Sequence, residues 1–217
     1  MELVLTMIII GILGALSVSM IGGGEDARKF EDTKAKMEKI RLGILGDDSL
    51  DKDGHRRIFG YHGDWGGLPT TLSDLVTAKS PAWVFDSVYG VGGGWKSVYW
   101  TPDFTDSSAV TKDGWGTLFN YNPAASPPTL TSYGSDGAAG GSFFAKDLVM
   151  TFPTTVRLAT VRGMVMDGVA RLSGVDVELR YPVAGVVTAF TATTDFQTSA
   201  KRGQEPPPCL LYLLGYR

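Results

Sequence analysis

Residues 1–21, MELVLTMIIIGILGALSVSMI, form an almost unbroken apolar run that contains one charged side chain, the carboxylate of Glu2. As an α-helix, the roughly 19 residues from Leu3 to Ile21 would extend about 28 Å, which matches the hydrocarbon core of a bilayer. A secretory signal peptide differs, because it carries Lys or Arg before a shorter apolar core. An acid at the membrane end of such a helix costs free energy unless it is neutralised, so we expect Glu2 to have a function.

The motif ELVLTMIIIGILGAL, residues 2–16, resembles the N-terminal segment of the type IV pilins and the type II secretion pseudopilins. The resemblance implies that Glu2 is an assembly residue, which pairs with the N-terminal ammonium of a neighbouring subunit while the helices pack as the core of a helical filament. Family members carry a few residues before the Glu, whereas Met1 alone precedes it here. We therefore expect the leader and the first mature residues to lie upstream of this sequence.

Glycines mark two parts of this N-terminal segment. Gly22–Gly24 follow the apolar run, and a helical pattern then resumes with apolar residues near one face, namely Ala27, Phe30, Met37, Ile40 and Ile44. We predict one long helix, bent or melted near these glycines. The resemblance implies that a stretch of the helix unwinds in the filament, for which Gly11, Gly14 and Gly22–Gly24 are the candidates. Alternatively, Gly11 and Gly14 allow close helix packing in a membrane.

The composition fits a membrane-anchored globular subunit. A chain of 217 residues can hold one or two small domains beyond the anchor, and its 28 glycines and 11 prolines indicate many turns. The net charge of −3 gives no electrostatic basis for binding nucleic acid. A single cysteine, Cys209, cannot form an internal disulfide.

Residues 47–80 are expected to connect the helix to the globular part. Within them, Gly67–Thr70 resembles the Pro-Thr turn of the pseudopilins and predicts a short helix that Thr71 or Ser73 caps. The stretch at 51–54, Asp-Lys-Asp-Gly, has only part of a calcium-loop pattern, so a solvated turn is the preferred interpretation.

Residues 111–149 contain TKDGWGTLFNYNP and then LTSYGSDGAAGGSFFAKDLV, which resemble the strand, turn and calcium loop of the major pseudopilin of type II secretion. The matching positions are Asp113, Trp115, Gly116, Ser132, Tyr133, Gly134, Asp136, Gly137, Asp147 and Leu148. The resemblance implies a calcium site. We expect Asp136 and Asp147 to be its side-chain ligands, with backbone carbonyls near Tyr133 and Ser142 completing the shell.

A loop without metal, held by turn hydrogen bonds, is the alternative interpretation of the same residues. The loop contains few acids, and the ammonium group of Lys146 beside Asp147 would lower its affinity for a cation.

Residues 80–110 are rich in aromatic side chains, including Trp83, Trp95, Tyr99 and Trp100. Exposed aromatics of this kind stack on sugars or form contacts between subunits. The alternative is that they cover the core of a small domain.

From Met150 onward, short stretches rich in Val and Thr alternate with turn signals at Asp167-Gly168, Ser173-Gly174 and Ala184-Gly185. Residues 161–182, VRGMVMDGVARLSGVDVELRYP, resemble the opening of carboxypeptidase-regulatory-like, prealbumin-type β-sandwich modules. Residues 204–208 predict a rigid extended stretch, and the apolar residues 209–217 predict a final strand or a tail that is buried at an interface.

The chain has no pattern that is typical of an enzyme, so we predict that it has no catalytic site. His55 and His62 lie in an expected loop without HExxH or CxxC spacing. They could join Asp53 or Asp64 in a surface metal site, but solvated loop histidines are the preferred interpretation. The glycine-rich segments lack the Lys and Ser/Thr of a phosphate loop.

We predict an α+β fold in which a long N-terminal α-helix, half apolar and half amphipathic, packs on a small antiparallel sheet with a calcium-type loop. A C-terminal β-sandwich-like module would follow. The predicted domains are a transmembrane or filament-core helix at 1–24, a pseudopilin globular domain at 25–150, and a β module with a tail at 151–217.

The resemblance implies a structural subunit that polymerises into a type IV pilus-like or type II secretion pseudopilus filament. Its partners would be copies of itself, the inner-membrane assembly machinery, and minor pilins or pseudopilins. We expect it in the bacterial inner membrane before assembly and in a periplasmic or extracellular filament afterwards. The alternative is a membrane-tethered minor pilin or adhesin whose β module binds a carbohydrate or a surface partner.

Overall fold

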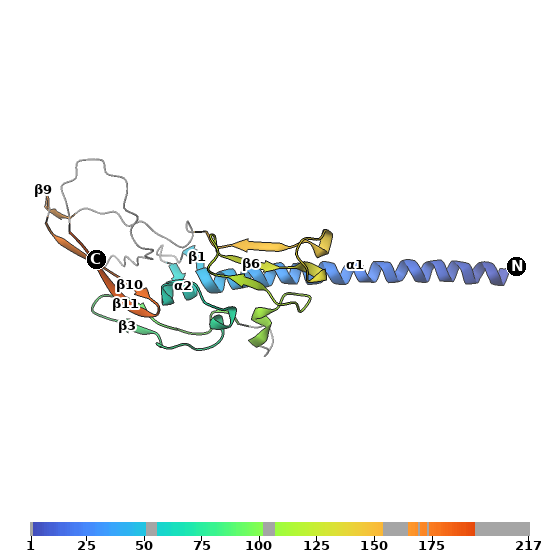
Figure 1. The fold of residues 1–217 in the computed structure, drawn as a ribbon, viewed down its shortest axis with the longest axis horizontal. Helices are drawn as coiled ribbons and strands as arrows, with labels where there is room; N and C mark the ends of the chain where they lie inside the picture. Colours follow the sequence, from blue (N-terminus) through green and yellow to red (C-terminus); the bar gives the residue numbers. More distant parts are fainter. Residues whose placement is uncertain are drawn as a thin grey trace.

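The computed structural model describes residues 2–50, 56–101, 107–153, 165–168, 170–172 and 174–193. Within these ranges, side chains are not described for 2–23, 48–50, 56–57, 107 and 170–171. Figure 1 shows one long helix whose N-terminal part extends far beyond the rest of the chain, which we call the body and define as residues 24–193. The molecule is therefore elongated, with the body gathered around the C-terminal half of this helix.

The helices and strands follow one another in this order: α1 Glu2–Leu45, β1 Asp47–Leu50, β2 Arg56–Ile58, α2 Gly60–Trp65, η1 Leu72–Leu75, β3 Val84–Asp86, β4 Val91–Gly93, η2 Ser107–Thr111, β5 Asn120–Asn122, β6 Thr129–Ser132, η3 Gly134–Asp136, η4 Phe143–Ala145, β7 Leu148–Thr151, β8 Met166–Asp167, β9 Ala170–Arg171, β10 Asp176–Val183 and β11 Val186–Thr193. Every η element is a short 3₁₀ helix.

Helix α1 supplies one side of the hydrophobic core. Met37, Ile40 and Ile44 recur at helical spacing and are buried, as the periodicity of the sequence predicts. They pack against side chains from α2, η1, η2, β6 and the segments between elements, namely Tyr61, Leu72, Leu75, Trp100, Val110, Phe119, Leu130 and Phe152. The predicted face also contains Ala27 and Phe30, which are only partly buried because they lie nearer the projecting end.

The helix continues through Gly22–Gly24, so the predicted melted segment is absent from it. It ends at Gly46, whose φ of 79° is a left-handed conformation and whose N–H donates to the carbonyl of Leu42 at 2.7 Å. A Cβ at Gly46 would lie 2.2 Å from the carbonyl oxygen of Ile58. Only glycine satisfies both the conformation and the close approach at this helix end.

The sheets are small and antiparallel. The largest has three strands in the order β5-β6-β7, with Leu130 of β6 facing the core beside α1. The remaining strands form two-stranded pairs: β1 with β2, β3 with β4, β8 with β9 and β10 with β11.

The β10–β11 hairpin rests on the body by its turn. Ala184 and Gly185 form a two-residue turn with positive φ at both positions, which confirms the predicted turn. The N–H of Gly185 donates to the carbonyl of Trp65 in α2 at 2.7 Å, and a Cβ on Gly93 of β4 would touch Val187. Figure 1 shows this hairpin beyond the C-terminal end of α1.

The predicted fold class is wrong. The described chain is a mixed α/β protein with one main helix and several small antiparallel sheets, and it contains no long apolar helix among its described side chains. In the part of 151–217 that the structure describes, the strands form separate hairpins instead of a β-sandwich-like module. The predicted turns at Asp167-Gly168 and Ala184-Gly185 join paired strands, whereas Ser173 of the third predicted turn lies outside the described residues. The alternation of apolar and polar residues carries no information about whether a second sheet covers these strands.

No helix that the structure describes is both long enough and apolar enough to cross a membrane, with the search limited to those residues.

Candidate functional site

The DGWG segment, residues 113–116, is held by the carboxylate of Asp113, which is 2% exposed. One oxygen, Oδ1, accepts hydrogen bonds from the backbone N–H groups of Trp115 at 3.0 Å and Thr117 at 2.9 Å. The other oxygen, Oδ2, accepts the hydrogen bond that the Ser132 hydroxyl donates at 2.6 Å. A buried carboxylate is tolerated when its oxygens have donors, so Asp113 ties this turn to strand β6.

The same turn packs against α1. The N–H of Gly114 donates to Thr33 Oγ1 at 2.9 Å, and the indole Nε1 of Trp115 donates to Asp26 Oδ1 at 3.1 Å. A Cβ on Gly114 would lie 2.2 Å from the carbonyl oxygen of Lys29. The Asp-Gly-Trp motif therefore joins the helix to the sheet.

The glycine-rich loop between β6 and β7 closes through its own hydrogen bonds. Both carboxylate oxygens of Asp147 lie 3.1 Å from the N–H of Gly140, and the N–H of Asp147 donates back to the carbonyl of Gly140 at 3.2 Å. Oδ1 of Asp136 accepts the N–H of Ala138 at 3.2 Å. These are hydrogen bonds of the kind that the alternative interpretation, a loop without metal, requires.

The four predicted calcium ligands are spread along this loop. Asp136 and Ser142 are exposed, and Asp147 is partly buried. The side-chain hydroxyl of Tyr133 accepts a hydrogen bond from Asn120 Nδ2 at 2.7 Å, outside the loop, whereas the predicted ligand is a backbone carbonyl near this residue. Among the described residues, no three or more His, Cys, Asp or Glu side chains come together in a group that could hold a metal ion. Calcium binding stays a prediction.

The predicted environment of His62 is wrong, because this residue lies buried in α2 instead of in a solvated loop. His55 and Asp53, as well as the turn at 51–54, lie outside the described residues. Asp64, the other acid considered for a metal site with them, is also buried in α2.

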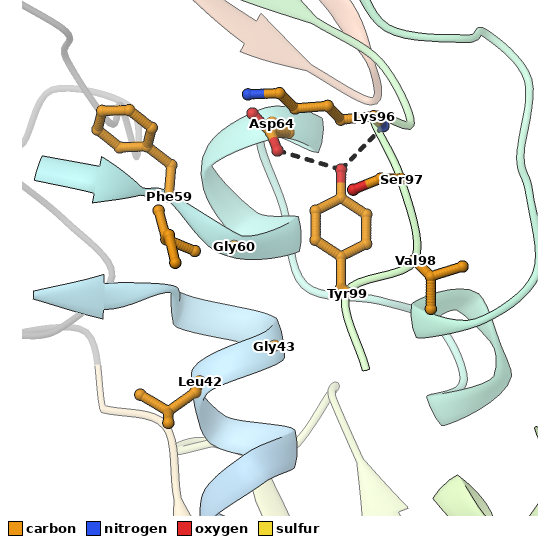
Figure 2. A pocket seen from close by; sticks show the side chains of 10 residues that line it. Leu42, Gly43, Phe59, Gly60, Asp64, Lys96, Ser97, Val98 and Tyr99 are labelled. Atoms are coloured by element: carbon orange, nitrogen blue, oxygen red, sulfur yellow. Dashed lines mark hydrogen bonds between the residues drawn. The ribbon is translucent and has the colours of Figure 1, made fainter. Parts of the chain in front are cut away.

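A pocket of 350 Å³ opens beside the C-terminal end of α1 (Figure 2). It is lined by Leu42 and Gly43 of α1, by residues 58–60, by Asp64, and by the segment 96–99. Apolar side chains at its edge include Ile58 and Val98, which are both exposed. The pocket is therefore an open concavity with a partly apolar rim.

One wall of this pocket carries a buried carboxyl group, since Asp64 is 8% exposed. Its Oδ2 accepts the hydroxyl of Tyr99 at 3.2 Å, and that hydroxyl accepts the N–H of Lys96 at 3.0 Å. Burial raises the pKa of Asp64, although the Lys96 charge and the Tyr99 hydrogen bond act in the opposite direction. Burial also raises the pKa of Tyr99, so its hydroxyl remains a donor at neutral pH.

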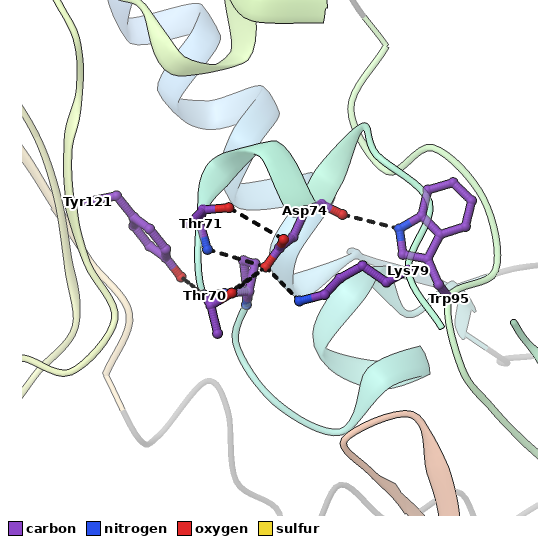
Figure 3. Close-up of polar contacts among 7 residues, drawn as sticks. Thr70, Thr71, Asp74, Lys79, Trp95 and Tyr121 are labelled. Atoms are coloured by element: carbon purple, nitrogen blue, oxygen red, sulfur yellow. Dashed lines mark hydrogen bonds and ion pairs between the residues drawn. The ribbon is translucent and has the colours of Figure 1, made fainter. Parts of the chain in front are cut away.

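A second polar cluster, around Asp74, stabilises the turn before η1 (Figure 3). Asp74 Oδ2 accepts the hydroxyl of Thr70 at 2.7 Å, the N–H of Thr71 at 3.2 Å and the ammonium of Lys79 at 3.0 Å. Burial raises the pKa of Asp74, but these hydrogen bonds outweigh it, so the pKa lies below its ordinary value. Thr71 and Asp74 form a capping box on η1, which confirms Thr71 as the predicted cap.

The aromatic residues of 80–100 divide between core and surface. Trp100 is buried, and Trp95 donates its Nε1 hydrogen to the carbonyl of Asp74 at 3.1 Å. Trp83 instead stacks on Phe85 of β3, with ring centroids 5.9 Å apart and planes 18° apart. Phe85 is half exposed. Trp95 and Trp100 therefore fit the alternative in which the aromatics cover the core. A contact with sugars or with other subunits stays a prediction for Trp83 and Phe85.

Phe143 was not among the predicted site residues. It begins η4 with a φ of 51° and is 91% exposed, whereas its neighbour Phe144 packs against Phe30 of α1 with ring centroids 5.9 Å apart. A bulky residue in the left-handed region is a conformational outlier. The only signal in the sequence is the adjacent pair Phe143-Phe144, because a single turn cannot bury both rings.

The predicted assembly residues Glu2, Gly11 and Gly14 all lie in the projecting part of α1. Their side-chain environments lie outside the described residues, so their roles stay predictions. Asp64 and Asp74 were also missed as polar centres, since isolated acids near aromatic residues give no recognisable pattern. Compared with protein-family models, with curated proteins and with solved structures, the chain matched none.

Proposed function

We propose that this protein is a structural subunit that polymerises into a pilus-like or pseudopilus filament through the N-terminal part of α1. The observation that carries the proposal is the projection of this part beyond the body, where no other described element covers it (Figure 1). Its sequence is the apolar run that begins the chain. Burying apolar side chains away from water is favourable, and the same segment of other copies provides an apolar surface on which they can pack.

The body suits a role in a polymer because it is firmly attached to the helix that would connect subunits. The core residues of α1, the turn at Asp113 and the contact between Phe30 and Phe144 all join body and helix. A subunit built in this way transmits force from one helix to the next without separating from its body. Its inner-membrane origin and its partners among assembly proteins belong to the same proposal.

Replacing the predicted assembly acid tests the proposal. Glu2→Ala should abolish filaments, or reduce them severely, because the carboxylate would no longer pair with the amine of an incoming subunit. The matched control is Glu25→Ala, which removes an exposed acid of the same helix whose partner is Lys29 of the same chain. Negative-stain microscopy of sheared cell-surface material measures filaments, and near-UV circular dichroism checks the body. Normal filaments from Glu2→Ala would contradict the assembly role.

A membrane-tethered minor pilin or adhesin is the second candidate. Phe85, which is half exposed where it stacks on Trp83, favours it, because exposed aromatic side chains bind sugar rings. The two candidate functions predict different amounts of this chain in a filament. A filament composed mainly of this chain supports the first function. A filament of other proteins in which this chain is a rare component supports the second.

A further inference from the structure

The exposed ring of Phe143 is presented to solvent by a constrained loop. Its backbone lies in a left-handed conformation, and the next residue, Phe144, is anchored on Phe30 of α1. On the other side, a Cβ on Gly141 would lie 2.3 Å from the carbonyl oxygen of Ala145, so the loop is tightly folded. A well-held aromatic side chain with 91% of its surface in water is a typical anchor of a protein interface.

The pocket at the C-terminal end of α1 has the properties of a receptor for such a ring. Its volume of 350 Å³ exceeds that of a phenylalanine side chain. Leu42, Ile58 and Val98 provide apolar surface, and the hydroxyl of Tyr99 covers one oxygen of the Asp64 carboxyl group. Figure 2 shows Leu42, Val98, Tyr99 and Asp64 around the pocket.

The ring and the pocket lie at different levels along α1. The loop contacts the helix at Phe30, and the pocket begins at Leu42, which at ~1.5 Å per residue corresponds to about 18 Å along the axis. Figure 1 shows the loop region toward the projecting helix and the end of α1 farther along the body, next to α2. Two different, complementary surfaces of the same chain form a heterologous contact, which generates open filaments when it does not close into a ring.

Charge favours the same pairing. The loop around Phe143 carries Asp136 and Asp147 against one cation, Lys146, whereas the pocket lining carries the exposed Lys96 and the buried Asp64. The exposed ammonium of Lys96 at the pocket edge attracts a loop of net negative charge.

We propose that Phe143 of one copy inserts into the pocket beside α1 of the next copy. The contact repeats from subunit to subunit between the bodies and aligns them along the polymer. This inference rests on the proposed filament function, and it adds a second contact to the one that the projecting helices make.

Disulfide trapping tests the contact directly. In a Cys209→Ser background, the pair Ser142→Cys with Val98→Cys keeps the Phe143 ring and should yield an oxidation ladder of dimers, trimers and larger species, because Ser142 is exposed beside Phe143 and residue 98 lies on the pocket rim. The control pair is Ser142→Cys with Val88→Cys, since Val88 is 81% exposed but lies outside the pocket lining. The control should give no ladder. Equal ladders from both pairs would overturn the proposal.

Each remaining outcome separates this inference from the filament function. Filaments with no ladder from the 142/98 pair overturn the inference alone. A ladder without filaments supports the contact and overturns the filament function. The absence of both overturns both.

A second variant tests the pocket without changing the loop. Ser97→Trp should fill the pocket from its exposed edge and reduce the ladder at least tenfold, while the melting temperature of the body stays unchanged. An undiminished ladder in this variant would contradict insertion of the ring.

Discussion

Asp113 shows how one side chain can determine whether the helix and the sheet stay together. Its carboxylate is buried and receives three hydrogen bonds, two from the backbone of its own turn and one from Ser132 of β6. Removing it would leave those donors buried without an acceptor, which is more costly than the loss of a net hydrogen bond. Asp113 is therefore a structural residue of the motif that resembles the pseudopilin calcium loop.

Asp113→Ala should lower the free energy of unfolding by about 3 kcal/mol, because buried unsatisfied donors cost ~1–3 kcal/mol each. Urea unfolding followed by tryptophan fluorescence measures the change. The control Asp167→Ala removes an exposed acid at the β8–β9 hairpin and should change the value by no more than about 0.5 kcal/mol. Equal effects of the two substitutions would show that the buried carboxylate does not hold the turn.

Asp74 makes a different contribution, which depends on pH. Its folded-state pKa lies below the ordinary value, so the stability it contributes is present above the unfolded pKa of about 3.9. That contribution is lost as the pH falls through the folded pKa. Wild type should exceed Asp74→Asn in unfolding free energy at pH 6–7, and the difference should shrink below about pH 4. A difference that is constant across this range would contradict an ionised Asp74 as the acceptor of Thr70, Thr71 and Lys79.

Helix α1 was predicted from its sequence more reliably than any other element. The periodicity of Met37, Ile40 and Ile44 located the buried face, because apolar residues at helical spacing must face a core. The prediction of a melted segment at Gly22–Gly24 was wrong. Glycine lowers helix stability by only about 1 kcal/mol per residue, and a long helix on both sides compensates for that.

Substituting Ala for the glycines at the two ends of residues 24–46 should change the stability of the protein in opposite directions. Gly46→Ala should destabilise the protein by more than ~2 kcal/mol, since it combines a left-handed φ with a backbone clash. Gly24→Ala should stabilise it by up to about 1 kcal/mol, because nothing lies within 4 Å of the added Cβ. Thermal unfolding of both variants checks the pair, and the same sign for both would contradict the described helix boundary.

The smaller elements were harder to predict for a physical reason. Turn signals located the β10–β11 hairpin at Ala184 and Gly185, because positive φ at both positions restricts the residues there. Nothing in the local pattern indicates that this turn rests on Trp65 of α2, since that contact joins residues far apart in the sequence. The pocket and its Asp64 were missed for the same reason, as they assemble from four separate segments.

The described part of the molecule consists of a body that contains one half of helix α1, with the other half projecting from it (Figure 1). The proposed polymer would use two contacts: one between projecting helices and one between bodies through Phe143. A polymer held by both would resist shear better than one held by either alone. The predicted β-sandwich would have placed a separate module outside this arrangement, whereas the observed hairpin lies on α2 and β4.

Electron cryo-microscopy of the full-length wild-type chain, sheared from the cell surface, tests the filament proposal most directly. The account predicts long helical filaments composed mainly of this chain, with the N-terminal part of α1 at the axis and the bodies outside. Particles that are uniformly monomeric, or filaments with α1 on their outer surface, would contradict it.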